Sequence, residues 1–461
     1  MGFQVLVPPL RHDLDRDNPL QFSCYSFTPS GYRNLYLQTE RGFGRGEQMI
    51  NRRFSRSRFS QFVGGLLAMV AMLVSAASAS TTQVIYSFAG GNDGEYLDTD
   101  LVVDNAGNIY GTTVQGGDFG SGTVFQLSPS GNGWIHTVLY SFKGGKDGGE
   151  PYKGVTLDAQ GNLYGTAVTG GGGTCEGGCG VVFKLTNSGG IWTQSVIHYF
   201  TGGNDGSGPG SGLTFDSHGN LYGMTPTGGV DGYGTIYQLR PQSNGTWRLS
   251  VIHTFTGGDD GSSASAGRLI LDRAGNLYGV TTVGGANGKG VAFEITHTSA
   301  GWTLLPLYAF KDQPDGAFPY GGLIFDRAGN LYGTTYYAGA NDVGTVYRLT
   351  HSNGSWTETV LYNFKGGTDG SSPISTLVFD TAGDLYGTSS EGGTGCACGV
   401  IFKLARGTNG AWTESVPYRF PGAPGAGFSY NGMVADSAGN FYGATTHGGP
   451  ANDGTIYQFI P

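Results

Sequence analysis

The segment GLIFDRAGNLYGTTYYAGANDVGTVYRL at residues 322–349 decides the fold, because close variants of it recur along the chain. It holds three short runs rich in β-branched and aromatic residues, which are separated by glycine-rich turns: GLIFD (322–326), NLYGTT (330–335) and GTVYRL (344–349). A fourth run, TLLPLYAF (303–310), precedes it. Such runs are typical of β-strands, and no window carries a helical period. Each unit therefore predicts four strands.

The string NLYG, or a close variant, sets the period of the repeat. Its tyrosine occurs seven times at intervals of 54–58 residues: Tyr110, Tyr164, Tyr222, Tyr278, Tyr332, Tyr386 and Tyr442. Four strands in about 55 residues is the content of one β-propeller blade. The sequence thus predicts an all-β protein, a seven-bladed β-propeller of four-stranded antiparallel blades over residues 83–461.

The two ends of this region carry different run types. It begins with the first type, QVIYSF (83–88), and ends with the fourth, GTIYQF (454–459). Because open sheet edges are a liability, we expect the N-terminal strand to pair with the last blade and close the ring. The alternative phase, in which each blade is one continuous unit, stays open at this point.

Residues 49–79 read as a signal peptide. Arginines at 52, 53, 56 and 58 precede an apolar stretch of 16 residues (62–77), and Ala77-Ser78-Ala79 fits a cleavage site. A stretch of this length falls short of the ~20 residues that span a bilayer, so we expect no membrane span after cleavage. We interpret residues 1–48 as a disordered leader from a start codon placed too far upstream.

Composition restricts the partners of the exported part. Residues 80–461 hold 16 basic and 29 acidic residues, a net charge of −13. Such a body repels phosphate backbones, which argues against nucleic acid as a partner. A monomer that is periplasmic or extracellular is the expectation.

Six tryptophans each lie eight residues before a phenylalanine. An even spacing places both rings on one face of a strand if no bulge intervenes. We interpret them as structural, packing between neighbouring sheets; the alternative is an aromatic platform for a ligand. The tryptophans are Trp134, Trp192, Trp247, Trp302, Trp356 and Trp412.

An aspartate ends the second run of every copy, as Asp326 does, and a glycine follows three residues later. This pattern predicts a tight hairpin in which the carboxylate accepts backbone N–H bonds and the glycine takes positive φ.

Other acids mark the loops that would share one rim of the propeller. Carboxylates with backbone carbonyls suit Ca²⁺, and acids with aromatic groups suit sugar hydroxyls, so the rim is a candidate ligand or calcium site. The competing interpretation is local, since Asp-Gly is a turn former. After the first run stand Asp93, Asp147, Asp205, Asp260, Asp315 and Asp369; after the third run stand Asp118, Asp231, Asp342 and Asp453.

Four cysteines form two local pairs, Cys175/Cys179 and Cys396/Cys398, each in an enlarged loop between the third and fourth runs. In an oxidising compartment, such pairs predict disulfides that shape the loop more than they stabilise the fold. A zinc site joining both pairs is rejected, because the second and sixth copies would lie on roughly opposite sides of the ring.

Catalytic patterns are weak. Neither H-E-x-x-H nor G-x-S-x-G occurs, and the sequence suggests no catalytic residue, metal or other cofactor beyond the possible Ca²⁺. His198 and His253 stand where other copies have tyrosine, as substitutions within a packed strand.

The units with GNLYGTT, a following GG and GTVFxL resemble the Gloeobacter–Verrucomicrobia tandem repeat, and the likeness covers residues 83–461. The resemblance implies an exported bacterial protein, of a kind whose members carry different C-terminal anchors, and it supplies no catalytic residue. Since Pro461 directly follows the last strand, we expect no such anchor here. The runs are more distantly similar to kelch and NHL blades.

The sequence therefore favours an exported, non-catalytic binding or structural protein that recognises carbohydrate or another surface ligand. The alternative is a secreted propeller enzyme, a glycoside hydrolase, lyase or lactonase-like protein acting on polysaccharide or a small ester. Broken symmetry would distinguish them, because an enzyme needs channel-facing polar residues unlike their counterparts in other copies. Only mild departures are evident in the sequence, which favours binding.

Overall fold

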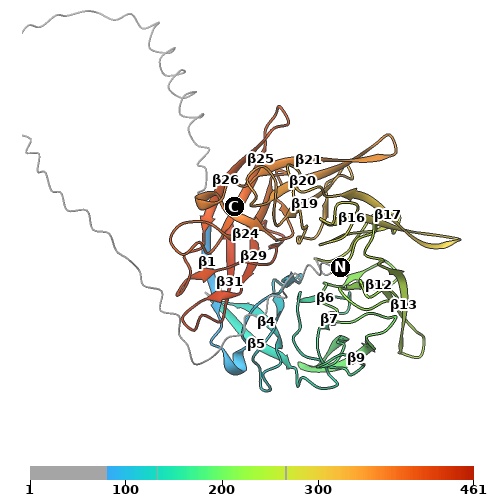
Figure 1. Cartoon of the computed structure of the whole chain (residues 1–461). Helices are drawn as coiled ribbons and strands as arrows, with labels where there is room; N and C mark the ends of the chain where they lie inside the picture. Colours follow the sequence, from blue (N-terminus) through green and yellow to red (C-terminus); the bar gives the residue numbers. More distant parts are fainter. Residues whose placement is uncertain (1–79, 132, 265–266) are drawn as a thin grey trace, which may run out of the picture. The chain divides into compact units, whose positions relative to one another are not determined.

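The computed structural model describes residues 80–461 except 132, 265 and 266. These residues form seven four-stranded blades around a common axis (Figure 1). Within this part the helical content is two short 3₁₀ turns, Gly91–Asp93 and Gly367–Asp369, and no helix could cross a bilayer. The predicted all-β, seven-bladed propeller is confirmed. The predicted leader (1–48) and signal peptide (49–79) lie outside the described residues.

Blades 1 to 3 run from the axis outward in chain order. Blade 1 comprises β2 (Val102–Val103), β3 (Ile109–Thr113), β4 (Thr123–Ser130) and β5 (Gly133–Ser141). Blade 2 comprises β6 (Val155–Leu157), β7 (Leu163–Ala167), β8 (Val181–Ser188) and β9 (Ile191–Tyr199). Blade 3 comprises β10 (Thr214–Phe215), β11 (Leu221–Thr225), β12 (Thr235–Pro241) and β13 (Trp247–Thr254).

Blades 4 to 6 repeat this order, with one added strand in blade 6. Blade 4 comprises β14 (Ile270–Leu271), β15 (Leu277–Thr281), β16 (Val291–Thr298) and β17 (Gly301–Ala309). Blade 5 comprises β18 (Ile324–Phe325), β19 (Leu331–Thr335), β20 (Thr345–Ser352) and β21 (Ser355–Asn363). Blade 6 comprises β22 (Ser371–Pro373), β23 (Val378–Phe379), β24 (Leu385–Glu391), β25 (Val400–Arg406) and β26 (Trp412–Arg419).

Blade 7 combines the two ends of the propeller. It comprises β28 (Val434–Ala435), β29 (Phe441–Thr445), β31 (Thr455–Ile460) and β1 (Thr81–Ser87), and a short pair, β27 (Ala426–Gly427) with β30 (His447–Gly448), lies in its loops. Strand β1 runs antiparallel to β31, from Thr81 opposite Ile460 to Ser87 opposite Thr455 (Figure 1). The predicted closure of the ring by the N-terminal strand is confirmed, and it settles the blade phase.

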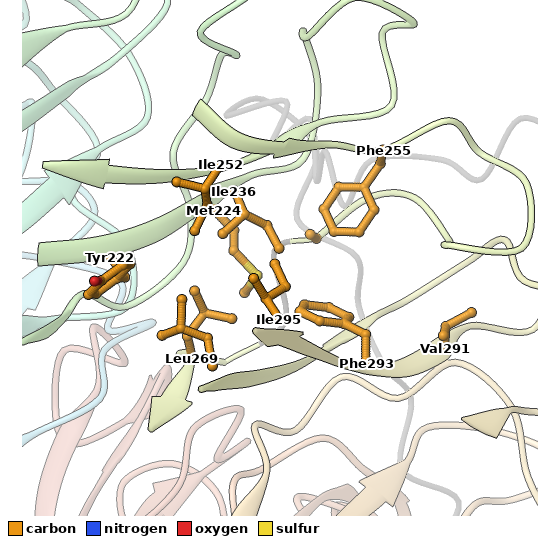
Figure 2. Close-up of a cluster of buried hydrophobic side chains, with 11 residues drawn as sticks. Tyr222, Met224, Ile236, Ile252, Phe255, Leu269, Val291, Phe293 and Ile295 are labelled. Atoms are coloured by element: carbon orange, nitrogen blue, oxygen red, sulfur yellow. The ribbon is translucent and has the colours of Figure 1, made fainter. Parts of the chain in front are cut away.

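The hydrophobic core lies between the blades. Figure 2 shows one of seven such clusters, in which Met224 and Ile236 of blade 3 meet Phe293 and Ile295 of blade 4, with Phe255 in the loop between the two blades. Each blade therefore buries both faces against its neighbours, which a single sheet of this size cannot do alone.

A β-bulge in every outer strand determines against which neighbouring blade the aromatic side chains of that strand pack. In blade 4, Ala292 pairs with Tyr308 and Phe293 with Pro306, so Leu307 is an extra residue. The bulge reverses the alternation of side chains beyond it. Trp302 and Phe310 therefore do not share a face: Trp302 packs between blades 3 and 4, and Phe310 between blades 4 and 5.

The turn between the two inner strands is built as the sequence predicts. In blade 5, Asp326 Oδ1 accepts the N–H groups of Ala328 and Asn330 at 2.8 and 2.9 Å, and Oδ2 accepts the Tyr332 hydroxyl at 3.0 Å. Gly329 has φ +86°, a conformation that favours glycine. Because Tyr332 also packs in the core between blades 5 and 6, the turn is tied to the blade interface.

Blade 6 carries a variant of this turn. Asp384 stands where six copies have asparagine, so two carboxylates lie close together. The ammonium of Lys403 lies 2.8 Å from Asp384 and 4.0 Å from Asp380. Burial lowers the pKa of Lys403, but its hydrogen bonds to Asp384 and Tyr386 outweigh burial and raise it, so the cation offsets the added charge.

Candidate functional site

Two sets of loops form one face of the propeller. The loop that leaves each outer strand pairs with the loop after the second strand of the next blade, for example Glu95 with Gln115 and Ala317 with Tyr337. Backbone hydrogen bonds link the members of each pair, such as Glu95 N to Gln115 O at 2.9 Å. We call this side of the molecule the loop face.

The aspartates after the outer strands lie on the loop face, and each is engaged within its own loop. Asp369 accepts a hydrogen bond from the Tyr362 hydroxyl and from the backbone N–H of Lys365, both at 2.7 Å. His198 takes the place of tyrosine in blade 2, where its Nε2 lies 3.2 Å from Asp205. The structure places the others in the same turn: Asp93, Asp147, Asp260 and Asp315.

The remaining rim acids lie in separate loops of blades 1, 3, 5 and 7. Asp118, Asp231 and Asp342 are exposed, and Asp342 accepts a hydrogen bond from Gln313 at 2.6 Å. Asp453 lies near Glu95 and Asp93, and burial together with these acids raises its pKa. Among residues 80–461 as described, no three His, Cys, Asp or Glu side chains gather as a metal site. The structure does not bring the ten rim aspartates together.

The predicted cysteine pairs form disulfides. Cys175–Cys179 lies in blade 2 and Cys396–Cys398 in blade 6. In each case the two sulfur atoms lie against a glycine of the loop face, Gly202 and Gly422, where an added Cβ would come within 2.7–2.8 Å of them. The disulfides therefore shape the same face that the other loops build.

The innermost loops of the blades meet at the ring axis. A narrow cavity there is lined by residues of six blades, among them Asp100 of blade 1, Tyr320 of blade 5 and Asn431 of blade 7. Neighbouring loops approach closely: a Cβ on Gly154 would lie 2.0 Å from the carbonyl oxygen of Asp100. This cavity marks the central channel.

Charged side chains cross the channel. The Lys153 ammonium donates to Asp98 Oδ1 at 2.7 Å and to Asn431 Oδ1 at 3.0 Å, and so links blades 1, 2 and 7. Arg268 of blade 4 lies 3.9 Å from Asp100. Burial lowers the pKa of Lys153, but Asp98 and Asp100 raise it above its ordinary value, so the ammonium stays charged.

Five tyrosines surround these charges. Tyr320 and Tyr336 contact edge to face with ring centroids 5.6 Å apart. Burial raises the pKa of Tyr430 to about 12, with smaller effects of Tyr96 and Asp98, and the pKa of Tyr152 also rises through burial and the nearby Asp98. We call these five residues the tyrosine mouth: Tyr96, Tyr152, Tyr320, Tyr336 and Tyr430.

Sequence reasoning did not single out the channel residues. The position six residues before the turn aspartate holds Asp98, Tyr152, Gly210, Tyr320, Ile374 and Tyr430 in blades 1, 2, 3, 5, 6 and 7. A column-by-column comparison of the copies would have found this variable position. The symmetry of the chain is therefore broken at the axis more strongly than the sequence analysis recognised.

The tryptophans lie away from this site, at the blade interfaces. Trp302 meets Tyr222 with ring centroids 6.0 Å apart, and Trp247 meets Tyr164 at 5.8 Å. Trp134, Trp192, Trp356 and Trp412 pack in equivalent clusters.

Comparison with known proteins places the chain in a family. A family model of the Gloeobacter/Verrucomicrobia repeat matches residues 71–269, 172–396 and 272–461. The chain belongs to this repeat family. A search of curated proteins found no significant match to this chain.

Several solved structures are similar to this chain at low identity and with TM-scores below 0.5. One is a putative 6-phosphogluconolactonase from Bacteroides uniformis (14% identity, 69% of this chain and 83% of that chain covered, TM-score 0.46). Another is a protein from Lactobacillus plantarum (13%, 77% and 99%, 0.46). A third is the NanB sialidase from Streptococcus pneumoniae (11%, 82% and 70%, 0.38).

Proposed function

We propose that this repeat protein is an exported, non-catalytic binding protein that holds a surface ligand at the channel mouth on its loop face. The observation that carries this proposal is the broken symmetry at the axis. The turns repeat in all seven copies, whereas Asp98, Lys153 and Asn431 have no counterparts of the same type in other copies. A fold needs no such difference, but a site for an asymmetric ligand or substrate does; the pairing of these charges with one another is what favours binding over catalysis.

Carbohydrate is the ligand class that this chemistry favours. Ligand sites combine aromatic walls with a few placed polar groups. Tyrosine offers an apolar ring and a polar hydroxyl, and carboxylates, amides and ammonium groups complement sugar hydroxyls. The tyrosine mouth and the charges beneath it supply both kinds of group.

Export is supported by separate features. Two disulfides suit an oxidising compartment. The N-terminal segment reads as a signal peptide, and the net charge of −13 over residues 80–461 disfavours nucleic acid.

A secreted propeller enzyme is the second candidate, favoured by the same broken symmetry, which an enzyme also needs, and by the two carboxylates in the channel. Glycoside hydrolysis uses two carboxyl groups, one of which gives a proton to the leaving group. Asp98 instead accepts a hydrogen bond from Lys153, and Asp100 lies beside Arg268. Neither carboxyl group stands free to act as the acid, so binding is the better-supported function.

A glycan array with the purified exported protein, with and without Ca²⁺, tests the proposal beside a panel of glycoside hydrolase, lyase and lactonase substrates. We expect saturable glycan binding that does not depend on Ca²⁺, and no turnover. Turnover of any panel substrate at nanomolar protein would contradict the non-catalytic assignment.

A further inference from the structure

Two sets of charged contacts form the floor of the channel. Lys153 of blade 2 links Asp98 and Asn431 of the adjacent blades 1 and 7, and Arg268 of blade 4 reaches Asp100 of blade 1 from the other side of the axis at 3.9 Å. The space beside these contacts measures about 10 Å³, which holds about one water molecule. This space is too small for a sugar ring, so we place the ring of a bound ligand above the floor, within the tyrosine mouth.

One buried donor in this floor has no partner. The side chain of Asn431 is 2% exposed, and its Nδ2 makes no hydrogen bond with any described residue. Because its Oδ1 accepts from Lys153, the amide is oriented with Nδ2 as the unused donor. A buried donor left unpaired costs about 1–3 kcal/mol. Because Nδ2 is itself buried, only a group as small as a hydroxyl, entering the water-sized space that Asn431 lines, could bring it an acceptor.

The charges around Asn431 restrict what that ligand can be. Asp98 and Asp100 pair with Lys153 and Arg268, so these four partly buried side chains carry no net charge. A ligand with a net charge of either sign would therefore gain no net attraction from them. Hydroxyl groups both donate and accept hydrogen bonds, so they can bind to the neutral amide of Asn431 and to the paired charged side chains around it.

Resting on the proposed function, we infer that the channel binds the terminal residue of a neutral glycan, with a sugar oxygen accepting from Asn431 Nδ2. The ring of that residue lies within the tyrosine mouth, and the rest of the glycan extends away over the loop face. Recognition of a chain end follows from the closed floor, and neutrality follows from the balanced charges.

The first test replaces the donor. Asn431→Asp keeps the oxygen that Lys153 needs, replaces the unused N–H group by an acceptor and adds one negative charge, which the control variant adds as well. The matched control is Asn244→Asp in the exposed hairpin of blade 3, where Oδ1 accepts from Thr246 N at 3.0 Å. Isothermal titration uses linear neutral oligosaccharides that the array identifies, and methyl glycosides of glucose, galactose, mannose and xylose compete with them.

We expect Asn431→Asp to weaken binding at least tenfold (about 1.4 kcal/mol), Asn244→Asp to leave it unchanged, and one methyl glycoside to compete completely. Oligosaccharide binding that no methyl glycoside displaces and that Asn431→Asp leaves intact would overturn this inference but not the proposed function. If the wild-type protein bound no glycan at all, the proposed function itself would fail.

A second variant keeps the inference testable if Asn431→Asp does not fold. Asp100→Asn removes one negative charge and leaves the cluster with an excess positive charge. We expect the preference to shift at least tenfold from a methyl glucoside toward a methyl glucuronide, which carries a carboxylate. An unchanged preference in the folded variant would contradict the charge balance on which the inference depends.

Discussion

Each blade of this propeller has one turn between its two inner strands and one inner loop at the axis, and these two regions differ in how closely their residues repeat from blade to blade. The turns carry an aspartate in every blade, and Asp104, Asp216 and Asp436 make the same hydrogen bonds. The inner loops vary: the position six residues before that aspartate holds tyrosine in three blades and four different residues in the other four. The comparison teaches that repetition marks what the fold requires, and that departure from repetition marks where a ligand can be recognised.

The largest effect is expected where repetition is complete and burial is full. Phe255 is 0% exposed and packs in the cluster between blades 3 and 4 (Figure 2). Phe255→Ala removes a whole ring from this interface, so we expect a loss of about 3–5 kcal/mol in the free energy of unfolding. Guanidinium unfolding measures it, and Leu305→Ala, at a residue 53% exposed, serves as the control. Equal losses in the two variants would show that the blade interfaces do not hold the ring together.

The turns should come next. Asp326→Ala leaves the N–H groups of Ala328 and Asn330 and the Tyr332 hydroxyl without their acceptor. We expect a loss of about 1–3 kcal/mol in unfolding free energy. Glycan affinity should stay unchanged, because the turn is not part of the channel mouth. A variant that lost affinity while keeping its stability would reverse the assignment of the two regions.

In two blades, the outer strand carries a glutamate close to an aspartate of the loop that leaves the preceding blade; we call these two places the blade joints. Glu358 of blade 5 lies near Asp315, and Glu414 of blade 6 lies near Asp369. Burial, reinforced by the neighbouring aspartate, raises the pKa of each glutamate to about 7, although Lys311 and Lys365 act in the opposite direction. The neutral carboxyl group is thus favoured in the folded protein. At the same place in blade 1, His136 lies 3.1 Å from Asp93.

This pair of joints predicts a pH dependence of stability. A raised folded-state pKa means that the stabilisation is complete below the ordinary glutamate value, near pH 4.5, and is lost as pH rises through about 7. Allowing for partial exposure, Glu358→Gln and Glu414→Gln should each recover about 1–2 kcal/mol at pH 8. Thermal unfolding at pH 5 and pH 8 measures it. If the wild-type protein were equally stable at both values, the two joints would not hold neutral glutamates.

The sequence was sufficient to predict the number of blades, the inter-strand turns and the closure of the ring. The period predicted seven blades, and the run types at 83–88 and 454–459 predicted the closure that β1 and β31 make. The bulge at Leu307 could not be predicted, because its extra residue is another apolar residue in an apolar run. The channel could not be predicted for a different reason: Asp98, Lys153 and Asn431 are far apart in the chain and meet only because the ring is circular. Spacing within one copy contains no information about that meeting.

The smallest change in stability should separate the two regions most sharply. Tyr332→Phe deletes a hydroxyl that bonds Asp326 in a repeated turn, so we expect a loss of about 0.5–1.5 kcal/mol in unfolding free energy and no change in glycan affinity. Tyr152→Phe deletes a hydroxyl with no hydrogen-bond partner among the described residues, in the tyrosine mouth. It should leave stability within about 0.5 kcal/mol and weaken glycan binding by three- to tenfold. Both variants remove one oxygen atom from a tyrosine, so any difference between them reports position alone. If Tyr152→Phe instead lowered stability and spared binding, the inner loops would serve the fold as the turns do.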